Sequence, residues 1–142
     1  AGGRVLLVED EMSILKFTAR MFQKHGFQVH TTAMNGLEGL EMMNRNIYVA
    51  VFTDINMPVM DGFECVRRFR DWENESEERR SLRGGRQFVC AVTANAGPQG
   101  DRDRALRTGL MDAFVAKPAK IMDLVAMARR SAEDTLGHSN GN

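Results

Sequence analysis

The chain has 142 residues, 43% of them hydrophobic, which is enough for one packed domain and too few for a second domain of ordinary size. Its 19 basic and 19 acidic residues cancel, which excludes bulk attraction to nucleic acid or to an anionic membrane surface. No apolar run approaches the roughly 20 residues that a membrane-spanning helix requires, and two cysteines without a CxxC motif predict no disulfide framework. We therefore expect a soluble domain from a reducing, intracellular compartment.

The first half of the chain predicts two strands and two helices. The aliphatic run 5–8 has no polar alternation, so it predicts a strand that is buried on both faces of a sheet. A stripe at helical spacing follows it from Ile14 to His25, and a second stripe ends at Met43. Between these helices, residues 27–31 alternate apolar with polar side chains, which predicts a strand at a wetter edge of the sheet.

The second half of the chain continues this alternation. Buried strands are predicted at 49–52, 88–92 and 113–116, and the last helical stripe runs from Ile121 to Ala128. Strands that alternate with helices pair in parallel, because each helix crosses over the sheet to the next strand. The predicted fold is therefore α/β, with a five-stranded, parallel, doubly wound sheet and helices on both faces.

The folded domain is expected to cover residues 4–135. Residues 1–3 and 136–142 are polar or rich in glycine, so we expect the first to be a tail or linker remnant and the second to be a disordered tail. Residues 73–86 carry four acidic residues followed by four basic ones. We expect this charged insertion after the third helix to be a solvated surface extension.

Several polar side chains follow the predicted strands directly. Glu9 and Asp10 follow the first strand, Asp54 follows the strand at 49–52, and Thr93 and Lys117 follow the last two strands. Open α/β sheets bind ligands at the carboxyl ends of their strands, so these side chains are expected to converge. Three carboxylates brought together repel one another and require a cation, and an all-oxygen ligand set favours Mg²⁺.

The same strand ends predict phosphoryl chemistry. The Lys117 ammonium and the Thr93 hydroxyl could hold two phosphoryl oxygens while Mg²⁺ holds a third. Asp54 would then be the nucleophile and would form an aspartyl phosphate, because an ionised carboxylate needs no base to activate it.

Four motifs occur in order along the chain: VEDE at 8–11, TDINMPVMDG at 53–62, VTANA at 92–96 and AKP at 116–118. Together they resemble the receiver domain of two-component response regulators over nearly the whole predicted domain. The VTANA motif followed by GDR at 100–102 resembles the receivers of hybrid histidine kinases in particular.

The resemblance implies a flavodoxin-like strand order 2-1-3-4-5 and a site that works with Mg²⁺. In such a site Asp54 accepts a phosphoryl group from the phosphohistidine of a histidine kinase or phosphotransfer protein. Asp10 binds Mg²⁺ directly, Glu9 acts through water or a second contact, and Asn56 contributes its backbone carbonyl. Thr93 and Lys117 receive the phosphoryl oxygens.

The resemblance also implies how the domain signals. Phe114 occupies the aromatic switch position that turns inward as Thr93 moves toward the phosphate. Asn56 and Asn95 tune hydrolysis, and Pro118 follows a cis peptide. The face of the fourth helix and fifth strand changes and, together with the fifth helix, is a candidate dimer surface. Self-phosphorylation and self-dephosphorylation are the only expected chemistry, so no separate enzyme activity is expected.

Partners and location follow from the same resemblance. We expect no direct contact of this domain with nucleic acid or membrane. We expect a cytoplasmic location, either alone or as part of a larger, membrane-associated hybrid kinase.

Two loops depart from the family pattern, because 97–99 and 109–112 each carry one residue more. These departures fall on loops and on the fourth helix, so they bear on the geometry of the output face more than on the phosphorylation site.

Alternative explanations remain for single residues and for the whole chain. Asp10 alone fits a helix cap, Lys117 alone fits a surface cation, and Phe114 alone fits a core residue. A nucleotide or flavin site on the same fold is disfavoured, because Glu9 and Asp10 stand where a glycine-rich phosphate loop would be. A docking module without phosphorylation is disfavoured by the intact set of Asp54, Thr93 and Lys117.

Overall fold

The computed structural model describes residues 2–29, 32–75, 77, 81, 85–95 and 100–140, with side chains as far as Asp134. The first half contains β1 (Gly3–Val8), α1 (Met12–Lys24), β2 (Phe27–Gln28), β3 (Thr32–Ala33) and α2 (Gly36–Arg45). The second half contains β4 (Ala50–Thr53), α3 (Gly62–Asn74), β5 (Val89–Thr93), α5 (Asp101–Thr108), β6 (Ala113–Ala116) and α6 (Ile121–Asn140). Within the described residues, no helix is both long and apolar enough to cross a bilayer.

The strands form one parallel sheet in the order β2-β1-β4-β5-β6, with β3 also paired to β1. This confirms the predicted doubly wound, flavodoxin-like fold. The strand predicted at 27–31 is at the sheet edge as expected, but β2 ends at Gln28, and a second short strand, β3, follows at 32–33. His30 and Thr31 of the predicted strand lie outside the described residues.

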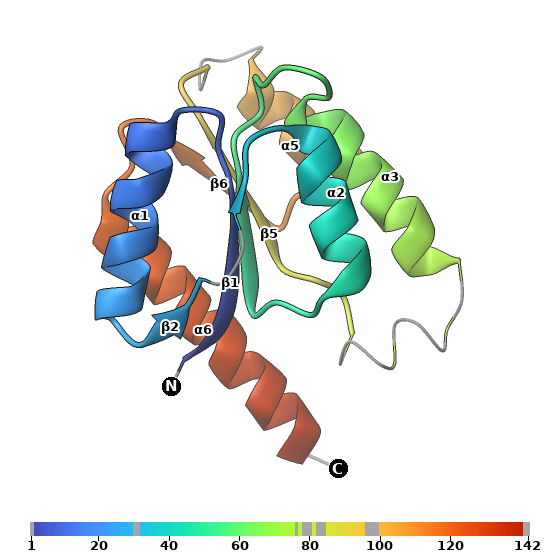
Figure 1. Cartoon of the computed structure of the whole chain (residues 1–142). Coiled ribbons are helices and arrows are strands. Elements are labelled where there is room, and N and C mark those ends of the chain that lie inside the picture. The colour runs from blue at the N-terminus through green and yellow to red at the C-terminus, as the bar shows by residue number, and fades with distance from the viewer. Residues whose placement is uncertain are drawn as a thin grey trace.

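Helices cover both faces of the sheet (Figure 1). On one face, α1 and α6 pack on the sheet through a cluster that includes Phe22, Phe52 and Val125. On the other face, α2 and α3 pack through a cluster that includes Met43 and Phe69. Each fully buried side chain of this size contributes about 1.5–3 kcal/mol relative to its exposed state. The two clusters hold the central strands rigidly, and hence the side chains at the strand ends.

The start of α3 fixes the loop that follows β4. The Gly62 N–H donates to the Ile55 carbonyl at 2.8 Å, and a Cβ atom at Gly62 would collide with the Asp54 carbonyl oxygen. Glycine is the residue that permits this close approach of two backbones. Asp61 caps α3 by accepting a hydrogen bond from the Glu64 N–H at 2.8 Å. The backbone around Asp54 is therefore held by the helix that follows it.

The charged segment 73–86 differs from the prediction at Glu73, whereas Glu75, Glu77, Ser81 and Arg86 are exposed as predicted. Glu73 is 2% exposed, and its carboxylate bonds the Arg70 guanidinium at 2.8 Å and the Gln87 N–H at 2.7 Å. Arg86 pairs with Asp112 at 2.8 Å, and Arg70 pairs with the same Asp112 at 2.9 Å. Both ends of the segment are thus tied to the protein by ion pairs or hydrogen bonds, and of its described residues only Glu73 is withdrawn from solvent.

The domain limits also differ slightly from the expected 4–135. Strand β1 already begins at Gly3, where the Val49 backbone N–H donates to the neighbouring Arg4 carbonyl at 2.8 Å. Helix α6 continues to Asn140, five residues beyond the predicted limit. The terminal Ala1, Gly141 and Asn142 lie outside the described residues.

Candidate functional site

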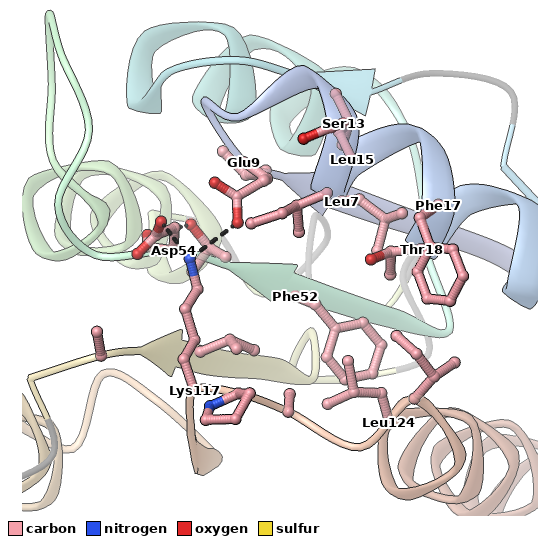
Figure 2. A pocket seen from close by; sticks show the side chains of 18 residues that line it. Leu7, Glu9, Ser13, Leu15, Phe17, Thr18, Phe52, Asp54, Lys117 and Leu124 are labelled. Atoms are coloured by element: carbon pink, nitrogen blue, oxygen red, sulfur yellow. Dashed lines mark hydrogen bonds and ion pairs between the residues drawn. The ribbon is translucent and has the colours of Figure 1, made fainter.

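The parallel register brings the predicted side chains together at one edge of the sheet. Val8 pairs with Thr53 between β1 and β4, and Thr93 pairs with Ala116 between β5 and β6. The residues after these strands therefore meet at their carboxyl ends. The Lys117 ammonium lies between two of them, with Nζ 2.9 Å from Glu9 Oε1 and 2.9 Å from Asp54 Oδ2 (Figure 2).

Three carboxylates form an acidic cluster beside this ammonium. One carboxylate oxygen each from Glu9, Asp10 and Asp54 lies within 4.8 Å of the other two. Glu9 and Asp54 are buried, and Asp10 is partly exposed at the edge of the cluster. Hard oxygen ligands with an open side fit Mg²⁺, which keeps several waters and binds through one or two carboxylates plus phosphate. The residues therefore suit a magnesium ion chemically.

The backbone orients the two buried carboxylates. The Ile55 N–H donates to Asp54 Oδ1 at 2.7 Å, which leaves Oδ2 directed at Lys117. The Glu11 N–H donates to Glu9 Oε2 at 3.2 Å, while Glu9 Oε1 accepts from Lys117. Each carboxylate thus has one oxygen fixed by the backbone and one that faces the shared ammonium.

Burial dominates the ionisation of this site. Desolvation raises the pKa of Glu9 above its ordinary value, and the hydrogen bond from Lys117 offsets only part of that effect. Burial alone would lower the pKa of Lys117, but its hydrogen bonds to Asp54 and Glu9 raise it. Lys117 therefore stays charged at neutral pH, while burial disfavours the ionised form of Glu9.

The substitution Glu9→Gln is expected to raise the melting temperature in EDTA and to reduce the stabilisation that Mg²⁺ provides. A raised folded-state pKa means that ionising Glu9 destabilises the fold as pH rises through that pKa, so a neutral amide removes this cost at neutral pH. The same change replaces one negatively charged carboxylate ligand of the acidic cluster with a neutral amide. Thermal melts with and without Mg²⁺ measure both effects.

Glu11→Gln is the matched control, because Glu11 is a glutamate only two residues after Glu9 and its side chain is exposed. It should change neither the melting temperature in EDTA nor the response to Mg²⁺ appreciably. A lower melting temperature for Glu9→Gln in EDTA would show that the ion pair with Lys117 outweighs desolvation.

Thr93 lies beside Lys117, but its hydroxyl forms a hydrogen bond with Asp101 rather than with a residue of the acidic cluster. The Lys117 backbone N–H donates to the Thr93 carbonyl at 2.9 Å, so Thr93 at the end of β5 lies next to Lys117, which directly follows β6. The Thr93 Oγ1 donates to Asp101 Oδ2 at 2.8 Å. Asp101 is the first residue of α5, and its role was not anticipated from the sequence.

The other predicted positions lie around this centre. Phe114 in β6 is half-buried and packs against the cluster of Ile55, Phe63, Ala91 and Ala105. Asn56 is exposed directly after Ile55. The Lys117–Pro118 peptide bond is cis, which confirms the expected bond. Of the two loops that depart from the family pattern, the loop at 97–99 lies outside the described part of the chain.

An apolar groove opens next to the acidic cluster. We call it the α1 groove; its volume is about 630 Å³, and it lies between α1 and the segment that leads from Lys117 into α6 (Figure 2). Leu15, Phe52 and Leu124 line its inner part, and Phe17, 56% exposed, stands on its outer side. The helical stripe predicts apolar residues on α1, but it does not reveal that the groove reaches the carboxylates.

Sequence comparisons place the chain among known proteins. Residues 5–129 match the model of a family described as response regulator receiver domain. The chain is 32% identical over 124 residues to hybrid signal transduction histidine kinase B of Dictyostelium discoideum, covering 86% of this chain and 6% of that kinase. It is also 32% identical over 126 residues to the transcriptional regulatory protein PrrA of Mycobacterium tuberculosis, covering 89% and 48%. The chain thus spans less than half the length of either relative.

Solved structures share the fold of this chain. The receiver domain of sensor histidine kinase PA1611 from Pseudomonas aeruginosa PAO1 superposes with a TM-score of 0.71 at 32% identity, covering 94% of this chain and 99% of that one. That structure is described with a magnesium ion coordinated in its active site cleft. A CheY-like receiver domain protein from Methanospirillum hungatei JF-1 has a TM-score of 0.77 at 23% identity and shares the fold.

Proposed function

The chain belongs to the response regulator receiver domain family, and from this premise we propose that it is a phosphoacceptor switch of two-component signalling whose acceptor is Asp54. The observation that carries this proposal is the Lys117 ammonium held 2.9 Å from Asp54 Oδ2 inside a cluster of three carboxylates. That arrangement neutralises and positions an oxyanion, which is most of what phosphoryl transfer requires.

In the proposed step, Asp54 Oδ2 forms a bond to phosphorus while the bond from phosphorus to the donor nitrogen breaks. The electron pair of the broken bond stays on the donor, which takes up a proton from water. Asp54 Oδ1 remains fixed by the Ile55 N–H, so only Oδ2 is free to attack. Lys117 exchanges its bond to Asp54 for a bond to a phosphoryl oxygen and keeps Glu9 as its second partner.

We propose that Glu9, Asp10 and Asp54 hold one Mg²⁺, together with the Asn56 backbone carbonyl. The presence of magnesium in the PA1611 receiver and the donor set of this chain support this assignment. When bound, Mg²⁺ supplies positive charge that offsets the phosphoryl oxygens. Asp10, partly exposed at the edge of the cluster, is suited to a direct bond, and Glu9, tied to Lys117 and the Glu11 N–H, to a second or water-mediated contact.

We propose that the donor is the phosphohistidine of a histidine kinase or phosphotransfer protein and that it docks over the α1 groove. A protein donor must bring its histidine to Asp54, so the surface beside Asp54 becomes its contact surface. Exposed apolar side chains on that surface, Ile14 at 39% and Phe17 at 56%, suit a helical partner with an apolar face.

The substitution Phe17→Ser is expected to lower kcat/KM for transfer from a phosphorylated protein donor by about tenfold or more, because an aromatic side chain buried on docking contributes about 1.5–3 kcal/mol. Its rate with a small donor such as phosphoramidate should not change. Leu37→Ser on α2, 41% exposed on the opposite face of the sheet, is the control and should affect neither rate. Equal losses with both donors would place Phe17 outside the docking surface.

Output is proposed at the face that α5, β6 and α6 form. Leu106 on α5 is 69% exposed there, which leaves an apolar side chain for a partner or for a second copy of the domain. Thr93 and Phe114 connect this face to the phosphorylation site. The proposed chemistry is confined to formation and hydrolysis of the aspartyl phosphate on this chain.

Beryllofluoride, an analogue of the phosphoryl group, is expected to raise the melting temperature only when Mg²⁺ is present. The expected rise follows from binding to the folded state alone. FMN and ATP serve as comparison ligands for a nucleotide or flavin site on the same fold. A rise with FMN or ATP and none with beryllofluoride and Mg²⁺ would overturn the proposed function.

A further inference from the structure

The hydroxyl of Thr93 is engaged on both sides. Thr93 is fully buried, its Oγ1 donates to Asp101 Oδ2 at 2.8 Å, and it accepts from the Asn95 N–H at 3.2 Å. A threonine hydroxyl carries a single proton. That proton cannot be donated to Asp101 and to another acceptor at the same time.

Asp101 is itself buried, with 8% of its surface exposed. Its backbone N–H donates to the Asn95 carbonyl at 3.0 Å, so the side chain and the backbone of one residue both bind the segment that leaves β5. A buried carboxylate without a partner carries a large desolvation cost. The Thr93 hydroxyl therefore offsets part of the cost of burying the Asp101 carboxylate, and Asp101 in turn fixes the position of that hydroxyl.

Helix α5 depends on this contact. Of its eight residues only Asp101 and Ala105 are buried, and its N-cap, Gly100, makes no side-chain capping bond. Arg104 adds one further contact, with its guanidinium carbon 4.0 Å from the centre of the Phe63 ring. The bonds of Asp101 thus fasten the first turn of the helix to the end of β5.

We propose that Asp101 is a positioning residue that holds the Thr93 hydroxyl in the unphosphorylated protein and surrenders it when a phosphoryl group is bound at Asp54. This inference rests on the proposed function. The hydroxyl then donates to a phosphoryl oxygen, and Asp101, left without its partner near a group of like charge, turns toward solvent with the first turn of α5. One hydrogen bond exchanged for another thereby couples the phosphorylation site to the helix.

The experiment measures the dissociation constant of beryllofluoride in the presence of Mg²⁺ for the full chain and three variants: Asp101→Ala, Thr93→Ala and the double variant. Removing the competing acceptor should lower the dissociation constant of Asp101→Ala by about tenfold or more, the ratio that corresponds to one hydrogen bond to a charged group. In the Thr93→Ala background the same substitution should have no effect, because the hydroxyl for which Asp101 competes is gone.

Two further variants separate this role from simple support of the helix. Asp103→Ala removes the other acidic side chain of the first turn and should leave the dissociation constant unchanged. Asp101→Asn keeps an acceptor for the hydroxyl and should give a smaller shift than Asp101→Ala; it also serves if the alanine variant does not fold. Amide hydrogen exchange at residues 101–104 should rise on binding of beryllofluoride in the unsubstituted protein and should already be fast in Asp101→Ala.

An unchanged or higher dissociation constant for Asp101→Ala would overturn the inference, as would an equal shift in the Thr93→Ala background. If the unsubstituted protein does not bind beryllofluoride with Mg²⁺ at all, the proposed function fails and this exchange fails with it. Normal binding by the unsubstituted protein without an effect of Asp101 overturns only the exchange.

Discussion

Asp54→Asn is expected to reduce phosphoryl uptake from phosphoramidate to background. The neutral amide cannot act as the nucleophile, and it removes one charge from the acidic cluster. The amide oxygen can still accept from the Ile55 N–H, so the fold around the site should persist. Intact mass spectrometry after incubation with phosphoramidate and Mg²⁺ measures the phosphorylated fraction.

Asp123→Asn is the matched control for this substitution. Asp123 is exposed in the first turn of α6 and is not a member of the acidic cluster, so its loss should leave uptake unchanged. Circular dichroism of both variants verifies that they are folded. Labelling of Asp54→Asn at the level of the unsubstituted protein would refute the assignment of the acceptor.

Glu73→Ala is expected to lower the free energy of unfolding by about 3–5 kcal/mol, the largest effect on stability that we anticipate for a single polar residue. The substitution leaves the buried Arg70 guanidinium with Asp112 and the Leu110 carbonyl, and it leaves the Gln87 N–H without its carboxylate acceptor. A buried cation that loses one of its two carboxylate partners, together with an unpaired backbone donor, accounts for the expected size. Urea denaturation provides the measurement.

Asp71→Ala on the same helix is the control for Glu73. Asp71 pairs with Arg67, and its side chain is 72% exposed, so its removal should cost no more than about 1 kcal/mol. Equal losses for the two variants would show that burial of Glu73 does not determine its contribution.

The strand ends could be predicted from the sequence because buried strands read as short aliphatic runs, and parallel order then follows from the alternation with helices. That reasoning places Glu9, Asp54 and Lys117 at one edge, and the bonds of Lys117 to both carboxylates confirm that they meet. The same pattern predicts less well at 27–31, because β2 ends at Gln28 and a second short strand, β3, pairs with β1 just beyond the predicted range.

Contacts between distant segments could not be predicted in this way. A run of charges predicts solvent exposure, yet Glu73 is buried because its partners include the Gln87 backbone, fourteen positions along the chain. Asp101 stands in a motif that the resemblance singles out, but its bond to Thr93 depends on how α5 folds back on β5. Ile14 belongs to the predicted apolar stripe of α1, and only the packing of the helix shows that it remains 39% exposed beside the site.

The most direct test of the central claim is to locate the phosphoryl group itself. The protein is incubated with phosphoramidate in Mg²⁺ or in EDTA, digested, and its peptides are sequenced by mass spectrometry under conditions that preserve acyl phosphates. We predict one modification, on the peptide that contains Asp54, formed in Mg²⁺ and lost in EDTA. Modification of a histidine such as His25, or of no residue at all in Mg²⁺, would contradict the assignment of Asp54 as the phosphoacceptor.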